Sequence, residues 1–393
     1  MITIFLQGNT MDRRSFLKTS SAIMGGLAVN SLFNQAVAET KTQFLLDAQH
    51  PLLLNFNENS LGMSPKAKDA VIAALPGSFR YPDDARADLI AALGKHYPLT
   101  DKHVTLGNGS SETIQAAVAM LAAKARQQNQ GLQLITPDPT FNYAELYTQS
   151  FAGKITKVPL KEDLSFDLKK MEQLADEFDG LSIIYICNPN NPTAMITPAS
   201  ELSEWMHKSS DKQFFIVDEA YAEFVEDPKF ISAIELVKQG KNNLVVTRTF
   251  SKIFALAGLR VGYGIATPEV IAAIDAFLPL DNTNTAGAVA ALASLQDKSF
   301  IAYSLKSNNL SRKIVETALD ELGITYAPSQ ANFIFHKVKG DVKTYQKRMA
   351  DAHIMVGREF PPAMGWSRLT LGTPEEMEQF VIVLKQFREK GWV

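Results

Sequence analysis

One lysine lies in a stretch whose residue types suit chemistry on a carbonyl group. Thr249-Phe250-Ser251-Lys252 is followed by mostly apolar residues and then by Arg260. Burial among such residues lowers the pKa of a lysine and keeps a neutral amine available to attack a carbonyl carbon. Arg260 offers a planar fork of donors that suits a phosphate group. The stretch therefore predicts a Schiff-base lysine beside a phosphate site, against the alternative of a solvated lysine at a helix start.

A second candidate is the acidic residue that ends an apolar run. Asp218 follows Phe214-Phe215-Ile216-Val217, where a carboxylate without a partner would be costly to bury. A pyridine N–H would be a suitable partner, because an ionised carboxylate keeps that nitrogen protonated and makes the ring a better electron sink. Tyr221, three residues later, can donate to a phenolic oxygen on the same ring. The alternative is that Asp218 caps the next helix.

A turn with two glycines offers a place for the phosphate itself. In Gly107-Asn108-Gly109-Ser110-Ser111-Glu112 the glycines let the backbone approach a ligand, and a helix is predicted to begin at the serines. The free N–H groups and positive dipole end of such a helix bind phosphate. Taken alone, the turn is equally consistent with an ordinary capped helix start.

The elements that must position these residues follow an alternating pattern. From about residue 86 to 264, amphipathic helical stretches alternate with short apolar runs, which is typical of crossover units on a mostly parallel sheet. Polar clusters directly follow several of these runs, and ligands bind at that edge of open α/β sheets. We expect strands at residues 103–106, 132–136, 181–187, 214–218, 244–247 and 261–265.

The pattern changes after residue 284 to long helical stretches, which indicates a smaller α+β domain. We expect helices at residues 286–296, 301–322 and 374–390 and a strand at 332–336. An arm and a helix at the start of the mature chain are expected to pack with this domain. The predicted parts are a signal peptide at 1–38, the arm and helix at 39–80, a large domain at 81–284 and a small domain at 285–393.

Composition narrows the class of partner. The 393 residues carry a formal net charge of only -3, without a basic stripe, so nucleic-acid binding has no electrostatic support. Cys187 is the only cysteine and cannot form an intramolecular disulfide. The expected partner is a small molecule, and no metal ion is expected.

The first residues resemble a twin-arginine export signal. Met11-Asp12-Arg13-Arg14-Ser15-Phe16-Leu17-Lys18 precedes a short, weakly apolar run that is too short to span a bilayer. Ala36-Val37-Ala38 has the form of a signal-peptidase site, so we expect cleavage after Ala38. The segment predicts passage through the twin-arginine translocase to the periplasm or outside. The alternative is a cytoplasmic protein whose tail happens to contain two arginines.

Several sequence motifs of the chain together resemble those of the class I/II, fold-type I aminotransferases, in particular the histidinol-phosphate aminotransferase branch. The resemblance begins at about residue 52 and runs to the C-terminus. It is carried by Asn57-Glu58-Asn59-Ser60-Leu61-Gly62, Tyr81-Pro82-Asp83, the turn at 107–112, Asn188-Pro189-Asn190-Asn191-Pro192-Thr193, Asp218-Glu219-Ala220-Tyr221, Ser251-Lys252 with Arg260, and Arg368-Leu369-Thr370-Leu371-Gly372-Thr373.

The resemblance implies the aspartate aminotransferase fold, with a mostly parallel seven-stranded sheet, and pyridoxal 5′-phosphate (PLP) as cofactor. Lys252 would form the Schiff base and shuttle the substrate proton, and Asp218 would pair with the pyridine nitrogen. Phe141 would stack on the ring, while Tyr81 would reach the phosphate of the neighbouring subunit in a homodimer. The other implied cofactor contacts are Gly109, Ser110, Ser111, Asn191, Tyr221, Thr249, Ser251 and Arg260.

Substrate contacts are implied less directly. Arg368 would bind the carboxylate of the amino acid in two-pronged fashion, and Asn57, Glu58 and Arg358 are further candidates. The stretch at 357–366 departs from the usual histidinol-phosphate enzymes, so the substrate stays open. We expect transamination between histidinol phosphate, or another amino compound, and 2-oxoglutarate. The alternatives are a PLP-dependent decarboxylase of a phosphorylated amino acid and a non-catalytic PLP-binding sensor.

Overall fold

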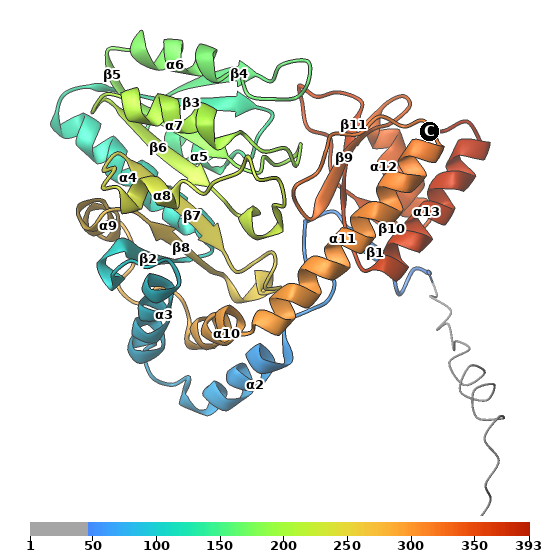
Figure 1. The fold of residues 1–393 in the computed structure, drawn as a ribbon, viewed down its shortest axis with the longest axis horizontal. Helices are drawn as coiled ribbons and strands as arrows, with labels where there is room; N and C mark the ends of the chain where they lie inside the picture. The colour runs from blue at the N-terminus through green and yellow to red at the C-terminus, as the bar shows by residue number, and fades with distance from the viewer. Residues whose placement is uncertain (1–45) are drawn as a thin grey trace, which may run out of the picture. The chain divides into compact units, whose positions relative to one another are not determined.

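The computed structural model describes residues 46–393 (Figure 1). The predicted export signal and its cleavage site lie outside the described residues. Within the described part of the chain, no helix is long and apolar enough to cross a membrane. The division into a large and a small domain stays a prediction.

A seven-stranded sheet, as the family resemblance implies, lies between helices in the left part of the view in Figure 1. Its strand order is β2-β8-β7-β6-β5-β3-β4. All pairs are parallel except those of β8, which runs antiparallel to both β2 and β7. The strands are β2 (Val104–Asn108), β3 (Gly131–Asp138), β4 (Lys154–Pro159), β5 (Gly180–Cys187), β6 (Gln213–Asp218), β7 (Leu244–Thr249) and β8 (Val261–Ile265).

Six of these strands occur where apolar runs predicted them, and β4 was missed. The missed strand Lys154–Pro159 lies at the edge of the sheet and pairs only with β3. Most of its side chains are at least partly exposed, and its sequence includes two lysines and a threonine among the apolar residues. Continuous apolar runs identify strands buried on both faces, so a half-exposed edge strand escapes that criterion.

Successive side chains of the central strands point to opposite faces of the sheet and pack into two separate hydrophobic cores, one on each face. Ile183 and Tyr185 of β5 pack with helix α4 (Ser110–Gln127) in one core. Ile184 and Ile186 of the same strand pack in the other. This alternation is the period of two that a pleated strand imposes. The remaining helices around the sheet are α3 (Asp83–His96), α5 (Tyr143–Ser150), α6 (Leu168–Asp176), α7 (Ala199–Lys208), α8 (Ile234–Lys238), α9 (Pro268–Asp275) and α10 (Thr285–Gln296).

The N-terminal arm pairs with the C-terminal part of the chain. Strand β1 (Leu52–Leu54) runs parallel to β10 (Ile354–Val356), and β9 (Phe333–Lys337) is antiparallel to β11 (Trp366–Thr370). These strands share a third core with the long helices beside them in Figure 1. Those helices are α11 (Lys298–Glu321), α12 (Val342–Asp351) and α13 (Pro374–Glu389), and α2 (Pro65–Ala74) packs on α10.

Because β1 pairs with β10, the residues that follow each strand leave this small sheet together. Residues 55–58 follow β1, and residues 357–360 follow β10. Both segments therefore reach the carboxyl ends of the large parallel sheet, where the polar clusters of the sequence also lie.

Candidate active site

A cavity of about 800 Å³ opens at the carboxyl ends of the parallel strands. It receives every residue that the sequence singled out as a site residue except Tyr81, whose side chain is 78% exposed and lies elsewhere. The roles of the individual residues stay predictions. The predicted residues that line the cavity are Asn57, Glu58, Gly109, Ser110, Ser111, Phe141, Asn191, Asp218, Tyr221, Thr249, Ser251, Lys252, Arg260, Arg358 and Arg368.

Lys252 follows β7 and extends into this cavity. Its Nζ donates to the backbone carbonyls of Phe56 at 3.2 Å and Asn57 at 3.1 Å, both in the arm after β1. Burial, followed by the positive charge of Arg368, lowers the pKa of Lys252 to about 8. At pH 7 about a tenth of this lysine is therefore a neutral amine, far more than for a lysine with the ordinary pKa, and attack on an aldehyde requires that form.

Asp218 ends β6 and is almost completely buried, with 2% of its surface exposed. Tyr185 donates to its Oδ2 at 2.9 Å and Thr247 to its Oδ1 at 3.3 Å. Burial nevertheless raises the pKa of Asp218 to about 6, because no cation contacts the carboxylate among the described residues. A buried carboxylate that faces a cavity is completed by a ligand with a positively charged N–H, such as a pyridinium ring.

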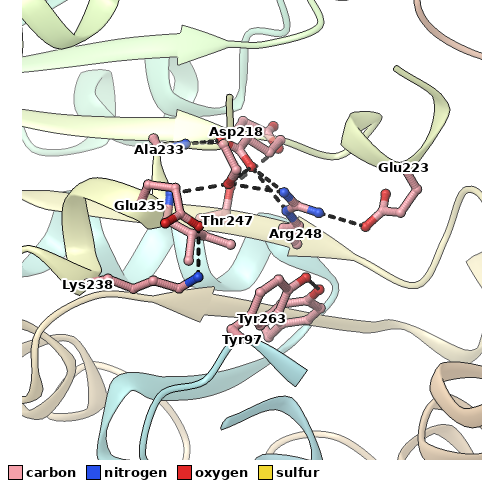
Figure 2. Close-up of polar contacts among 12 residues, drawn as sticks. Tyr97, Asp218, Glu223, Ala233, Glu235, Lys238, Thr247, Arg248 and Tyr263 are labelled. Carbon is pink, nitrogen blue, oxygen red and sulfur yellow. Dashed lines mark hydrogen bonds and ion pairs between the residues drawn. The ribbon is translucent and has the colours of Figure 1, made fainter. Parts of the chain in front are cut away.

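A buried ionic network lies beside Asp218 and fixes the strand ends (Figure 2). Arg248 of β7 donates to Glu219 through Nε at 3.1 Å and Nη2 at 2.6 Å, and to Glu223 through Nη1 at 3.0 Å. The hydroxyls of Tyr97 and Tyr263 meet at 2.7 Å below it in this view. Such a network tolerates little movement, because breaking it leaves a buried charge without a partner. It therefore holds the ends of β6 and β7 in a fixed relation.

The turn before α4 has the form of a phosphate cradle. Gly109 has a φ of 78°, in the region that favours glycine, and the helix begins directly after it. The Nη2 of Arg260 lies 3.4 Å from the Oγ of Ser111 and 3.2 Å from the backbone carbonyl of Asn108. A methyl group at Gly109 would collide with that guanidinium. The free amides of the helix start and one guanidinium thus converge on a single spot, which suits a phosphate.

A second and a third arginine line the same cavity. Arg368 of β11 is 7% exposed, and burial lowers its pKa to about 10. Its guanidinium lies 5.0 Å from the centre of the Phe360 ring, and that of Arg358 lies 4.4 Å from the same ring. Arg358 is exposed and reaches the cavity from the segment after β10. The cavity can therefore hold anionic groups at three points, marked by Arg260, Arg358 and Arg368.

Sequence reasoning missed several residues of the site. Tyr185 had a detectable signal: in β5 it lies two residues before Cys187, which pairs with Asp218 across the strands, so it shares that face. Thr247, which also donates to Asp218, lies in the strand on the other side. No local pattern marked the aromatic and amide residues that come from the loops. The cavity residues that were not predicted include Asn55, Phe56, Thr140, Asn142, Tyr143, Cys187, Gln346 and Phe360.

Comparison with known proteins decides the family. Residues 49–384 match the family model described as aminotransferase class I and II. The chain belongs to this family. The predictions of the aspartate aminotransferase fold, of an amino-group-transferring enzyme and of PLP as cofactor are confirmed at this level. Small-molecule amino and keto compounds are accordingly its substrates. For the residues that the structure describes, no cluster of three or more His, Cys, Asp or Glu side chains is arranged to hold a metal ion.

Relatives with similar sequences cover most of this aminotransferase. The histidinol-phosphate aminotransferase of Brevibacillus brevis is 34% identical over 334 residues, which are 84% of this chain and 88% of the relative. A crystal structure from Erwinia carotovora atroseptica, assigned provisionally to the same enzymes, is 41% identical with a TM-score of 0.85 and covers 88% of this chain and 98% of its own. The Sinorhizobium meliloti histidinol-phosphate aminotransferase, solved in complex with PLP, shares the fold at 22% identity and a TM-score of 0.78, covering 86% and 91%.

Proposed function

We propose that this aminotransferase takes the amino group from histidinol phosphate, or from a closely similar amine that carries an anionic group, and passes it to 2-oxoglutarate. The names of its relatives support the donor. One structural observation carries the proposal: a single cavity joins Lys252 and Asp218 with three guanidinium groups. In this proposal Arg260 binds the phosphate of the cofactor, which leaves Arg358 and Arg368 for the anionic groups of the substrates.

The residues of the cavity fit PLP, which when bound supplies an aldehyde and a ring that withdraws electrons from the reacting carbon. Arg260 and the turn before α4 would hold its phosphate, together with the hydroxyls of Thr249 and Ser251. Asp218 would receive its pyridine N–H, and Phe141 would cover one face of the ring. The amide of Asn191 and the hydroxyl of Tyr221 would donate to its phenolic oxygen.

Lys252 performs the proton transfer in this proposal. With a pKa of about 8, its amine both gains and loses a proton readily near neutral pH, which is the condition for efficient general acid–base catalysis. The carbonyls of Phe56 and Asn57 hold the amine while it is not bound to carbon. Lys252 would therefore move a proton between the Cα of the amino substrate and the carbon of the cofactor's aldehyde group.

Two arginines would bind different anionic groups of the substrates. Arg368 is fixed and nearly buried, which suits a carboxylate that is common to glutamate and 2-oxoglutarate. Arg358 is exposed and stacked on Phe360, so it has freedom to meet the phosphate of one substrate and a second carboxylate of the other. The aromatic side chains of Phe56 and Tyr143 line the same cavity and offer faces to an imidazole ring.

The experiment is an absorbance spectrum of the purified, PLP-loaded protein with histidinol phosphate in one cuvette and glutamate in another. The proposal expects the band of the lysine-bound cofactor to fall and that of the amine form to rise with both compounds. Bleaching by glutamate alone would remove histidinol phosphate as donor. Release of carbon dioxide from a phosphorylated amino acid, without the amine form, would favour the decarboxylase alternative.

We also propose a homodimer in which Tyr81 enters the neighbouring active site. Exposed apolar side chains lie in α2, directly after α2 and in the segment before α10, which packs on α2, and a monomer would leave them in water. They are Ile72, Leu75, Phe79, Tyr81 and Leu280. Light scattering of the purified protein tests the mass. A Tyr81→Phe variant that keeps the dimer but binds PLP less tightly would support the shared site, and unchanged PLP affinity would contradict it.

Export is a separate proposal that rests on the sequence of residues 1–38 alone. We propose that the twin-arginine translocase carries the folded protein out of the cytoplasm and that the signal is removed after Ala38. Fractionation of cells that express the full chain tests this, with the Arg13→Lys, Arg14→Lys double variant as control. Equal distribution of both proteins between the fractions would contradict export and favour a cytoplasmic enzyme.

A further inference from the structure

Asn57 sits at the junction of three elements of the active site. It follows β1 with a φ of 54°, and only 1% of its surface is exposed. Its side-chain Nδ2 lies 3.0 Å from the hydroxyl of Tyr221. Its backbone N–H and its Oδ1 both meet the hydroxyl of Thr370 on β11, at 2.9 and 3.2 Å. Its backbone carbonyl accepts hydrogen bonds from Nζ of Lys252 and Nδ2 of Asn332, both at 3.1 Å.

One arrangement of the hydrogens in this network leaves no buried donor of the described residues without an acceptor. The backbone N–H of Asn57 is a donor, so the hydroxyl oxygen of Thr370 accepts from it and the hydroxyl hydrogen remains for Oδ1 of Asn57. The reverse orientation of the amide would leave the buried Thr370 hydroxyl hydrogen without an acceptor among the described residues, so the NH₂ of Asn57 points toward Tyr221. The hydroxyl oxygen of Tyr221 must then accept, and its own hydrogen has to point away from Asn57.

The free direction of that hydrogen is the cavity. Tyr221 lines the cavity, and Asn57 is the hydrogen-bond partner of its hydroxyl among the described residues. We propose that Asn57 is a positioning residue that commits the Tyr221 hydroxyl to donate into the cavity, toward the phenolic oxygen of PLP. This inference rests on the proposed role of Tyr221 and gives Asn57 a task other than the substrate contact implied by the family resemblance.

Donation to a phenolate stabilises its deprotonated form, so the bound cofactor is expected to lose a proton at lower pH when Tyr221 donates. Other charges act on the same atoms and have to be held constant in a test. The titratable and charged groups around Tyr221 and Lys252 are Glu58 in the arm, Tyr185 and Cys187 of β5, Asp218 of β6, Arg260 before β8, Arg358 after β10 and Arg368 of β11.

The informative variant is Asn57→Asp, which is nearly isosteric. Asparagine and aspartate both tolerate a positive φ, so the backbone is not strained by the change. A carboxylate at this position can only accept, so it would draw the Tyr221 hydrogen away from the cavity. A new negative charge would also act on the cofactor directly, and this second effect needs its own control.

The test is a double-mutant cycle read by the absorbance of the PLP-loaded proteins as pH is raised. Tyr221→Phe, Asn57→Asp and the double variant are compared with the unmodified chain. Hydrogen bonds to charged groups correspond to a midpoint shift of about one pH unit or more. We expect the shift that Asn57→Asp causes to be larger by at least that amount in the unmodified background than in the Tyr221→Phe background, where the hydroxyl is absent.

Two further readouts make the outcomes separable. Asn57→Gly removes the donor to Tyr221, adds no charge and keeps a backbone suited to positive φ, so its midpoint should lie between those of the unmodified chain and Asn57→Asp. An unchanged midpoint in Asn57→Gly would overturn the positioning role. Equal shifts of Asn57→Asp with and without the Tyr221 hydroxyl would show a charge effect alone and overturn the positioning role. An unmodified chain that shows no titrating band with PLP would instead overturn the proposed function. Circular dichroism of the cofactor-free variants checks that each one folds.

Discussion

The Nη1 of Arg368 lies 2.6 Å from the Oδ1 of Asn191. This contact fixes the Asn191 amide, because its oxygen is used by the guanidinium and its NH₂ must point elsewhere. Nη2 of Arg368 donates to the carbonyl of Asn55 at 2.5 Å, whereas its Nε is buried and meets no acceptor in residues 46–393. The proposed carboxylate arginine is thus held by both a cofactor residue and the arm, with a donor left unused.

Replacing Arg368 by lysine is expected to weaken use of carboxylate substrates strongly. An ammonium group cannot keep the contacts to Asn191 and Asn55 while also binding a carboxylate with two parallel hydrogen bonds. Loss of one charged hydrogen bond corresponds to about 1.5–3 kcal/mol, so kcat/KM for glutamate should fall about 10- to 150-fold. Steady-state kinetics with glutamate measures this. Affinity for PLP serves as the control, and a fall confined to PLP binding would contradict a substrate role.

Asp218→Asn is expected to stabilise the cofactor-free protein above pH 6 while it abolishes activity. The pKa of Asp218 is raised from 3.8 to about 6, so the folded state is penalised as pH rises through that interval. The penalty is absent below pH 4 and complete above pH 6, where it amounts to about 3 kcal/mol. A neutral amide avoids it. Thermal unfolding of both cofactor-free proteins at pH 4 and pH 8 measures the difference, which should appear only at pH 8.

The converse result would also be informative for this carboxylate. If Asp218→Asn unfolds at a lower temperature than the unmodified chain at pH 8, the hydrogen bonds from Tyr185 and Thr247 outweigh the cost of burial. Adding PLP should stabilise the unmodified chain more than the variant, because only a carboxylate pairs with the pyridine N–H. Equal stabilisation of the two would contradict that pairing.

The sequence predicted those parts of the site that local patterns mark. Lys252, Asp218 and the turn at Gly109 stand at or shortly after the ends of buried strands, where residue type and position carry the signal. The Asn57–Thr370 contact joins residues 313 positions apart and depends on the pairing of β1 with β10, which no local pattern reveals. The Arg248–Glu219 pair was hidden for another reason: a charged residue inside a strand carries no sign of a partner on the neighbouring strand. Edge strand β4 was missed because half-exposed strands lack a continuous apolar run.

Binding of PLP to the cofactor-free protein is expected to accelerate with pH around a midpoint near 8. The neutral amine of Lys252 attacks the aldehyde, and burial together with Arg368 lowers the lysine pKa from 10.5 to about 8. Stopped-flow absorbance after mixing with PLP gives the rate at each pH. Lys252→Ala should bind PLP without the covalent band and lose about 100- to 10,000-fold or more of the activity. A midpoint near 10 would contradict the lowered pKa of the lysine.

Arg358→Ala should lower activity with a phosphorylated amine and leave activity with the unphosphorylated amine unchanged. Arg358 reaches the cavity from the segment after β10, and Gln346 supports that segment by donating to the carbonyl of Gly357 at 2.9 Å. Because the Arg358 side chain is exposed, its loss should leave folding unchanged and remove only its contact with an anion. We expect kcat/KM for histidinol phosphate to fall about tenfold or more, while that for histidinol is unchanged. Equal effects on the two amines would show that Arg358 does not meet the phosphate, and the second carboxylate of glutamate would then be its partner to test.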